Sequence, residues 1–299
     1  MQIVTDQGVD LSPAQAAGLN IHTVPLRITL NGKTYVGGKD IDYVSFYQIL
    51  TDTGAFPTTS QPSPGDFAEK YRELAKTDPD ILSIHLSSGL SGTFNAARLG
   101  AEMVPEAHVT VLDTKTLSGS SGWQVEAAAH AVEAGWVLGD VLKLVDEVRA
   151  GTQTLFTLAE LKYLIHGGRI SHLKGLMASV LNIKPVIGVA KEDGKYYNWG
   201  QATTFKRAIQ RMAEIIAEKI PAGTVLRVQL IHGNNLEGIS ILRERISALF
   251  ECHFDDVIPV APLLGAHTGP SVVGIGVAPL QIFTNCGLKI FPAEGVVAA

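Results

Sequence analysis

The residues with the clearest chemical potential form the stretch Ser87-Ser88-Gly89-Leu90-Ser91-Gly92-Thr93, which we call the cup. Its hydroxyls and its glycine-rich backbone offer hydrogen-bond donors to an anion. It contains no lysine or arginine, and it matches neither the G-x-x-x-x-G-K-[ST] nor the G-x-G-x-x-G pattern of nucleotide sites. We therefore expect it to hold a carboxylate or a single phosphoryl group, unless its hydroxyls serve only to cap a helix.

A serine hydrolase is the main alternative from another functional class. Gly89-Leu90-Ser91 resembles the start of the G-x-S-x-G nucleophile elbow, although Thr93 replaces the second glycine. Ser91, Asp113 and His267 would then form the triad, in the chain order that α/β-hydrolases use. The sequence lacks an H-G-G-G-type segment for the oxyanion, which argues against this hypothesis. A third hypothesis is a regulatory or structural module that uses no ligand in the cup.

The segments around the cup predict where it lies. An apolar run over 81–86 is typical of a buried strand, and the spacing of apolar residues over 94–104 indicates a helix. The cup is then a strand-to-helix turn that directs free N–H groups and the positive end of a helix dipole beyond the strand. Strand and helix signals alternate through residues 1–152, which predicts a parallel sheet covered by helices.

Two further stretches carry polar residues that could join the cup. Three prolines within 57–64 predict an extended loop without regular structure, and this loop includes Thr59 and Ser60. His267-Thr268-Gly269-Pro270 predicts a glycine and proline turn before a last apolar run over 272–280. From the residues alone, each stretch is either part of a ligand site or an ordinary connection.

The second half of the chain continues with strands and helices. A short helix over 160–165 stops at Gly167-Gly168, and Arg169 follows directly. Lys and Arg number 10 against 18 Asp and Glu in the first 152 residues, and 13 against 10 in the next 130, which supports a boundary between them. We expect an N-terminal α/β domain, a C-terminal α/β domain and a tail of unknown role, over 1–152, 153–282 and 283–299.

Composition excludes several classes of function. Of the 299 residues, 46% are hydrophobic and 18% charged, and no uncharged apolar run is long enough to span a bilayer, so we expect a globular protein without stable membrane insertion. The first residues carry no signal-peptide pattern, which predicts a cytoplasmic protein, and we expect a monomer. A net charge of −5 without a basic stripe argues against nucleic-acid binding. Cys252 and Cys286 are expected to be free thiols, and the nine histidines predict no metal site.

Taken together, the motifs make the sequence resemble the DegV family of bacterial fatty acid-binding proteins. Each motif is weak alone, but the set runs in family order from residue 6 to about residue 280. The motifs are Asp6-x-x-x-Asp10-Leu11, Thr59-Ser60-Gln61-Pro62-Ser63, the cup, Leu161-x-Tyr163-Leu164-x-x-Gly167-Gly168-Arg169-Ile170-Ser171, Lys184-Pro185 and His267-Thr268-Gly269-Pro270.

The resemblance implies a two-domain α/β protein of DegV-like fold, with a long-chain fatty acid in an apolar slot between the domains. It implies that the carboxylate is held by the hydroxyls of Thr59 and Ser91, helped by the backbone N–H of Gly92. The ligand-binding residues expected from the family motifs are Thr59, Ser60, Ser91, Gly92, His267 and Thr268.

The resemblance also implies a partner. Some members of the family present their fatty acid to a separate ATP-dependent fatty acid kinase, which phosphorylates the carboxylate to an acyl-phosphate. The binding protein is then not an enzyme and needs no cofactor. Arg169 matches an arginine associated with the kinase step rather than with lipid binding. The sequence departs from the family pattern at Phe94, Thr203 and Ser271, and Thr203, in place of an arginine, bears on kinase coupling.

Overall fold

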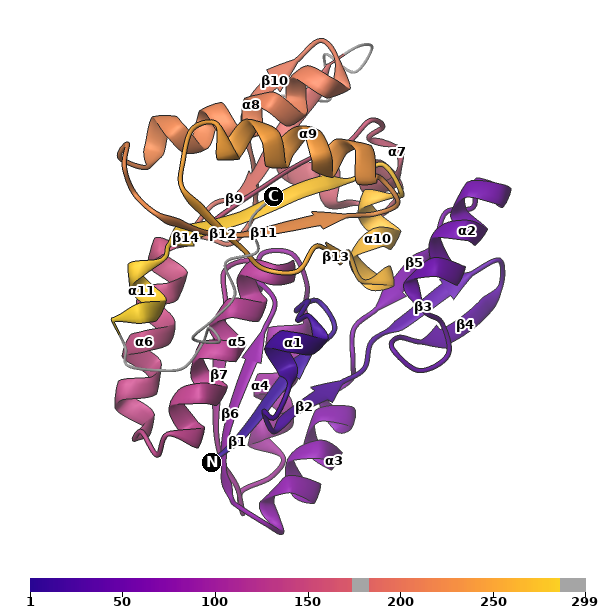
Figure 1. Cartoon of the computed structure of the whole chain (residues 1–299). Helices are drawn as coiled ribbons and strands as arrows, with labels where there is room; N and C mark the ends of the chain where they lie inside the picture. The colour runs from indigo at the N-terminus through magenta and orange to yellow at the C-terminus, as the bar shows by residue number, and fades with distance from the viewer. Residues whose placement is uncertain (174–182, 286–299) are drawn as a thin grey trace.

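The computed structural model describes residues 1–173 and 183–285 (Figure 1). Cys286 and the greater part of the expected tail lie outside these ranges. The first half contains a parallel sheet, as predicted, and its strand order is β2-β1-β6-β7. Its strands are β1 (Gln2–Asp6), β2 (Ile21–Val24), β6 (Asp80–His85) and β7 (His108–Asp113).

Helices cover both faces of this sheet because successive strand residues point to opposite sides. Val4 packs with α3 and α4 on one face, whereas Ile3 packs with α5 and α6 on the other. The short α1 begins with a capping box between Ser12 and Gln15. The helices of this half span α1 (Pro13–Ala16), α3 (Pro64–Ala75), α4 (Thr93–Glu102), α5 (Ser118–Glu133) and α6 (Leu138–Gly151).

A small antiparallel sheet, in the order β4-β3-β5, forms an arm beside the first sheet together with α2 (Figure 1). The expectation of an irregular loop over 57–64 is wrong here, because Thr59 pairs with Ile28 within β5. The prolines at positions 57 and 62 flank the strand without interrupting it, so the residues between them keep their N–H groups. The elements of the arm are α2 (Tyr43–Thr53), β3 (Arg27–Leu30), β4 (Lys33–Val36) and β5 (Thr58–Ser60).

The second half contains a mixed sheet in the order β10-β9-β8-β14-β11-β12, with the short β13 also paired to β11. Strand β11 runs parallel to β12 and β13 and antiparallel to β14. The strands are β8 (Gln153–Thr157), β9 (Lys184–Val189), β10 (Tyr196–Ala202), β11 (Leu226–His232), β12 (Cys252–Phe254), β13 (Ile258–Pro259) and β14 (Val273–Pro279).

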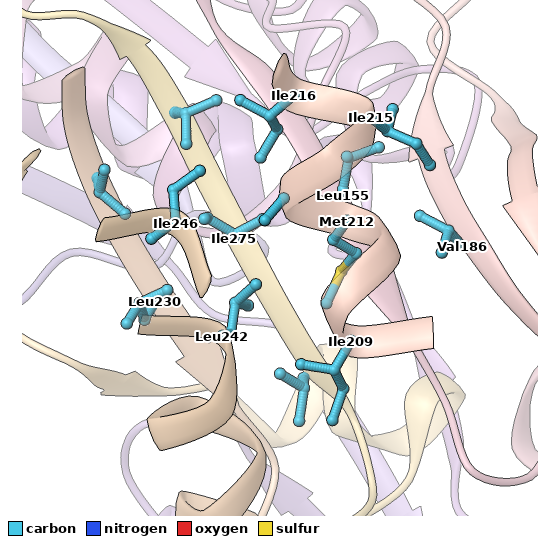
Figure 2. Close-up of a cluster of buried hydrophobic side chains, with 14 of the residues drawn as sticks. Leu155, Val186, Ile209, Met212, Ile215, Ile216, Leu230, Leu242, Ile246 and Ile275 are labelled. Atoms are coloured by element: carbon cyan, nitrogen blue, oxygen red, sulfur yellow. The ribbon is translucent and has the colours of Figure 1, made fainter. Parts of the chain in front are cut away.

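The two faces of this mixed sheet are covered differently. Helices α8 (Phe205–Lys219) and α9 (Leu236–Ser247) pack on one face through Ile209, Met212 and Leu242 (Figure 2). A second apolar cluster, which we call the central cluster, forms around the short helices α7 (Lys162–His166) and α10 (Pro262–Thr268). It joins residues of both halves, among them Leu90, Leu117, Phe156, Leu164, Ile187 and Leu264.

The last described residues pack against the first half of the chain. Helix α11 (Gln281–Thr284) carries Phe283, which is fully buried and lies with its ring centroid 5.6 Å from that of Trp123. Phe283 was assigned to the expected tail, but it belongs to the core between the parallel sheet, α5 and α6. The domain boundary expected between residues 152 and 153 stays a prediction.

A buried charge cluster also joins the two halves. Arg227 of β11 donates to Glu126 of α5 at 2.8 Å and to Asp255 at 2.9 Å. The indole N–H of Trp123 donates to Asp255 at 2.7 Å. Burial raises the pKa of Glu126 to about 7, and this effect outweighs the opposing influence of Arg227. Within residues 1–173 and 183–285, every helix is too short or too polar to cross a bilayer.

Candidate functional site

The cup lies where the sequence predicts it, between β6 and α4. Gly92 is the N-cap residue of α4, and Ser91 Oγ lies 2.9 Å from Thr93 Oγ1. Ser91 Oγ also accepts a hydrogen bond of 3.3 Å from the N–H of Thr93. Ser91 and Gly92 are half-buried, so their contacts at the start of α4 leave this end of the cup partly accessible.

The other end of the cup is occupied by contacts with the second half of the chain. Ser87 Oγ donates to the carbonyl oxygen of Gly194 at 2.8 Å. Gly89 lies so close to the same hairpin that a Cβ atom on it would be 2.5 Å from the carbonyl oxygen of Asp193. The N–H of Ser88 donates to Asp113. The first three residues of the cup therefore make contacts within the protein, and its Ser91–Gly92 end remains as the candidate part for a ligand.

Thr59 and His267 form a direct pair, although 208 positions separate them in the chain. Thr59 Oγ1 lies 2.8 Å from His267 Nε2. His267 lies in the last turn of α10, so the expected turn over 267–270 is wrong for its first two residues. The helix begins with Pro262 at its first position and ends at Gly269, which has a φ of 72°.

The environment of His267 keeps its imidazole neutral. The side chain is 8% exposed. Burial, followed by the electrostatic influence of the neighbouring Arg169 and His166, lowers its pKa to about 3. Its Nδ1 atom is buried and has no hydrogen-bond partner among the described residues. Gly167 packs so closely that a Cβ atom on it would lie 2.1 Å from Nδ1.

Gln61, which directly follows the strand of Thr59, contacts the cup. A Cβ atom on Gly92 would lie 2.2 Å from Gln61 Oε1, so the glutamine amide rests directly on the backbone of the cup. The sequence analysis assigned no role to Gln61, although it stands within the motif Thr59-Ser60-Gln61-Pro62-Ser63. Its place directly after Thr59 and Ser60 in this motif was the signal that could have identified it.

Two expected ligand residues have other surroundings. Ser60 is exposed, and the alternation of side chains along β5 turns it to the side opposite Thr59. Thr268 is 4% exposed, and its hydroxyl donates to the carbonyl oxygen of Leu264 at 3.1 Å. Among the described residues, the side chains of Ser60 and Thr268 form no hydrogen bond with Ser91 or His267.

Arg169 lies next to the Thr59–His267 pair. It follows Gly167 and Gly168 at the end of α7 and is half-buried. Its guanidinium donates to the carbonyl oxygen of Gly167 at 2.6 Å. Within residues 1–173 and 183–285 no Asp or Glu lies within ion-pairing distance of it, so its charge is available to an anionic group from outside.

The arrangement does not assemble a hydrolase triad. Among the described residues, Ser91 pairs with Thr93 and His267 pairs with Thr59. Asp113 accepts from the N–H of Ser88 at 3.1 Å and pairs with the ammonium of Lys115. The serine, the histidine and the aspartate therefore each have other partners, which argues against the hydrolase hypothesis.

The apolar surroundings of the site come from the central cluster. Leu90 lies within the cup, Leu164 lies on α7 and Leu264 lies one turn before His267 on α10. Two small pockets lie elsewhere along the junction of the halves, around Thr154, and the roomier of them offers only about 10 Å³, space for no more than one water molecule. The polar groups thus face a packed apolar cluster to which elements of both halves contribute.

Comparison with known proteins identifies the family. A family model described as "Uncharacterised protein, DegV family" matches residues 1–280. The chain is 36% identical over 273 residues to the DegV domain-containing protein SA1258 of Staphylococcus aureus, covering 91% of this chain and 96% of that one.

Solved structures share the fold. A DegV family protein from Thermus thermophilus, described by its fatty acid binding, is 31% identical with a TM-score of 0.83, covering 93% of this chain and 99% of that one. The fatty acid kinase (Fak) B3 protein of Streptococcus pneumoniae, loaded with linoleic acid, is 22% identical with a TM-score of 0.78, covering 93% and 99%. The match over residues 1–280 and these shared folds show that the chain belongs to the DegV family, in agreement with its motifs.

Proposed function

We propose that this protein binds a long-chain fatty acid, with the carboxylate at Thr59, Ser91 and the N–H of Gly92 and the alkyl chain in the central cluster. The observation that carries the proposal is the Thr59–His267 pair, which lies beside an apolar cluster that includes residues of both halves. The fatty acid binding of the Thermus thermophilus relative supports it.

The energetics favour such a ligand. Burying about 14 methylenes at roughly 0.8 kcal/mol each contributes on the order of 11 kcal/mol, against an association cost of about 4 to 15 kcal/mol. A carboxylate buried without donors would cancel that gain, so the hydroxyls and N–H groups at its end are required. Because the central cluster is packed in this structure, the alkyl chain has to displace side chains of the cluster as it enters.

Mass spectrometry of an organic extract of the purified protein is the direct test. We expect a long-chain fatty acid in about one-to-one ratio with the protein, or uptake of added fatty acid when the extract contains none. A protein that neither carries a fatty acid nor takes one up would contradict the proposed function.

The carboxylate site itself is tested by Thr59→Ala and Ser91→Ala. Each should weaken fatty acid binding by about 1 to 3 kcal/mol, because a hydrogen bond to a charged group is lost. Ser60→Ala is the matched control, since its hydroxyl lies on the opposite side of β5, and it should leave the dissociation constant nearly unchanged. Titration calorimetry gives the dissociation constant of the fatty acid for all three variants. Unchanged affinity in both Thr59→Ala and Ser91→Ala would place the carboxylate elsewhere.

We further propose that the bound fatty acid is presented, in the cytoplasm, to a separate ATP-dependent kinase that transfers the terminal phosphoryl group of ATP to the carboxylate. The family resemblance motivates this step. The charge of Arg169, beside His267 and without an acidic partner in the described chain, supports it.

Arg169→Ala should therefore separate binding from phosphorylation. We expect the variant to keep fatty acid affinity within about threefold, a difference of about 0.65 kcal/mol, while acyl-phosphate formation by the kinase falls strongly. Lys162→Ala is the control, because Lys162 is an exposed cation on α7 that pairs with Glu160. Loss of fatty acid affinity in Arg169→Ala would instead assign Arg169 to the binding site.

A further inference from the structure

We propose that the slot for the alkyl chain ends at a hydroxyl-binding site, so that the protein prefers a fatty acid with a hydroxyl group on its last carbon over the plain acid of equal length. This inference rests on the proposed function, because it concerns the far end of the same ligand. The residues that carry it are Thr154, Gly276 and Gln229, which we call the polar row.

The polar row crosses the mixed sheet on the face that carries the central cluster. Gly276 of β14 pairs with Thr154 of β8 on one side and with Gln229 of β11 on the other. Two residues further along these strands, about 7 Å away, the same face carries Phe156 and Ile231, which belong to the central cluster. The face of the sheet therefore changes from apolar to polar within one step.

The polar row lies at the end of the central cluster that is remote from the candidate carboxylate site. The chain runs from Thr154 past Phe156 to Leu158 and then enters α7, and Gly167 at the end of α7 packs against His267. At the rise of a strand, the four residues from Thr154 to Leu158 span about 13 Å. An alkyl chain that starts at the carboxylate site and crosses the central cluster therefore approaches the polar row with its far end.

The start of α5 lies directly on the polar row. A Cβ atom on Gly276 would be 2.6 Å from Ser120 Oγ in the first turn of this helix. Helix α5 has no side-chain cap. The N–H of Ser118 donates to the carbonyl oxygen of Gly8 at 2.8 Å, but the N–H groups of Gly119 and Ser120 have no acceptor among the described residues. These N–H groups form the positive end of the helix dipole, so they favour an acceptor.

Gln229 faces the same point with an acceptor that lacks a donor. Its side chain is fully buried, and its Nε2 donates to Gln15 at 3.3 Å. Its Oε1 has no partner among the described residues, and a Cβ atom on Gly119 would lie 2.3 Å from it. The pocket between them has no room for a water molecule. Leu117 and Ile231 line this pocket and also belong to the central cluster, so an alkyl chain that displaces them reaches it.

A hydroxyl group satisfies both sides of this pocket. It can donate to Gln229 Oε1 and accept from an N–H group at the start of α5. A methyl group leaves the acceptor and the donors buried without partners. A second carboxylate has no proton to donate to Gln229, and the next residue on this face of β11, Arg227, already pairs with Glu126 and Asp255. The chemistry of the pocket therefore favours an alcohol over a methyl group or an acid.

Titration calorimetry with two series of ligands tests the inference: saturated fatty acids of increasing length, and the same acids with a hydroxyl group on the last carbon. In a slot with an apolar end the hydroxy acid binds more weakly at every length, because its hydroxyl is buried without a partner. We expect the reverse at the length that reaches the polar row, where the hydroxy acid should bind about tenfold more tightly than the plain acid.

Weaker binding of the hydroxy acid at every length would overturn the inference, while the affinity of the plain acids would still support the proposed function. If neither series binds, the proposed function is contradicted and the inference with it.

The ratio of the two dissociation constants, measured within one variant, separates the pocket from general effects on stability. Gln229→Met removes the acceptor at nearly constant length, and the hydroxy acid should then bind no more tightly than the plain acid. Gln124→Met is the matched control, because Gln124 is also fully buried with an unpartnered Oε1 among the described residues but does not line the pocket. It should keep the tenfold preference. An unchanged ratio in Gln229→Met, or an equal loss of the preference in both variants, would contradict the assignment.

Discussion

Replacement of Gly167 by alanine should remove most of the fatty acid affinity while the protein stays folded. Gly167 has helical backbone angles, with a φ of −73°, so an alanine is compatible with the local backbone. The added methyl group would lie 2.1 Å from His267 Nδ1, and the imidazole has to move. Because the imidazole also holds Thr59, we expect affinity to fall by about tenfold to a hundredfold, roughly 1.4 to 2.8 kcal/mol.

The neighbouring glycine supplies the control. Gly168 has a φ of 76° and nothing within 4 Å of an added Cβ atom. Gly168→Ala should therefore cost stability through backbone strain, of about 1 to 2 kcal/mol, but leave the affinity for fatty acid close to that of the wild type. Calorimetric titration with fatty acid should show a loss of affinity in Gly167→Ala but not in Gly168→Ala. Urea unfolding should show the loss of stability expected for Gly168→Ala.

A double substitution sharpens the test. In Gly167→Ala/His267→Ala the methyl group finds the space that the imidazole has left, so the double variant should bind no more weakly than His267→Ala alone. Additive losses would show that Gly167 acts through something other than the imidazole.

The second large effect concerns stability. Arg227→Met should lower the free energy of unfolding by about 3 to 5 kcal/mol, because the substitution leaves two buried carboxylates, Glu126 and Asp255, without their cation. Arg211→Met is the matched control, since Arg211 pairs with Glu214 and Glu218 on the partly exposed surface of α8 and should cost less than about 1 kcal/mol.

The pH dependence of the Arg227→Met effect has a definite sign. Without the guanidinium, the folded state favours protonated carboxyl groups even more than the wild type, in which the pKa of Glu126 is already about 7. Protonation relieves the uncompensated charge, so the loss of stability should shrink as the pH falls from 8 to 6 and grow as it rises. Urea unfolding at several pH values measures this dependence. A loss of unfolding free energy in Arg227→Met no larger than that in Arg211→Met would contradict a role of the charge cluster in joining the halves.

Much of the fold could be predicted from the sequence because its signals are local. The strand before the cup, the helix after it and the alternation through the first half follow from apolar spacing and caps. The sequence analysis missed the edge strand Thr58–Ser60 because closely spaced prolines usually indicate irregular structure. The strand forms because its backbone pairs with β3. The helical position of His267 was missed for a similar reason, since the glycine that ends a helix looks like the centre of a turn.

The sequence could suggest the residues of the candidate site, which stay a prediction, but not their geometry. The family motifs identified Thr59, Ser91 and His267, whereas the contact between Thr59 and His267 depends on how α10 packs against the arm. The tight fit of Gly167 against the imidazole has no signal in the sequence beyond a glycine at a helix end. The partners of Arg227 are equally non-local, because Glu126 lies about a hundred positions before it in the chain.

The burial of Phe283 against Trp123 bears on how the chain folds during its synthesis. The first half emerges from the ribosome long before residue 283, by roughly 7 to 26 seconds at about 5 to 20 residues per second. Throughout that interval the indole of Trp123, fully covered in the finished protein, lacks its aromatic neighbour. The nascent first half therefore has an incomplete core, and its final packing waits for the arrival of α11.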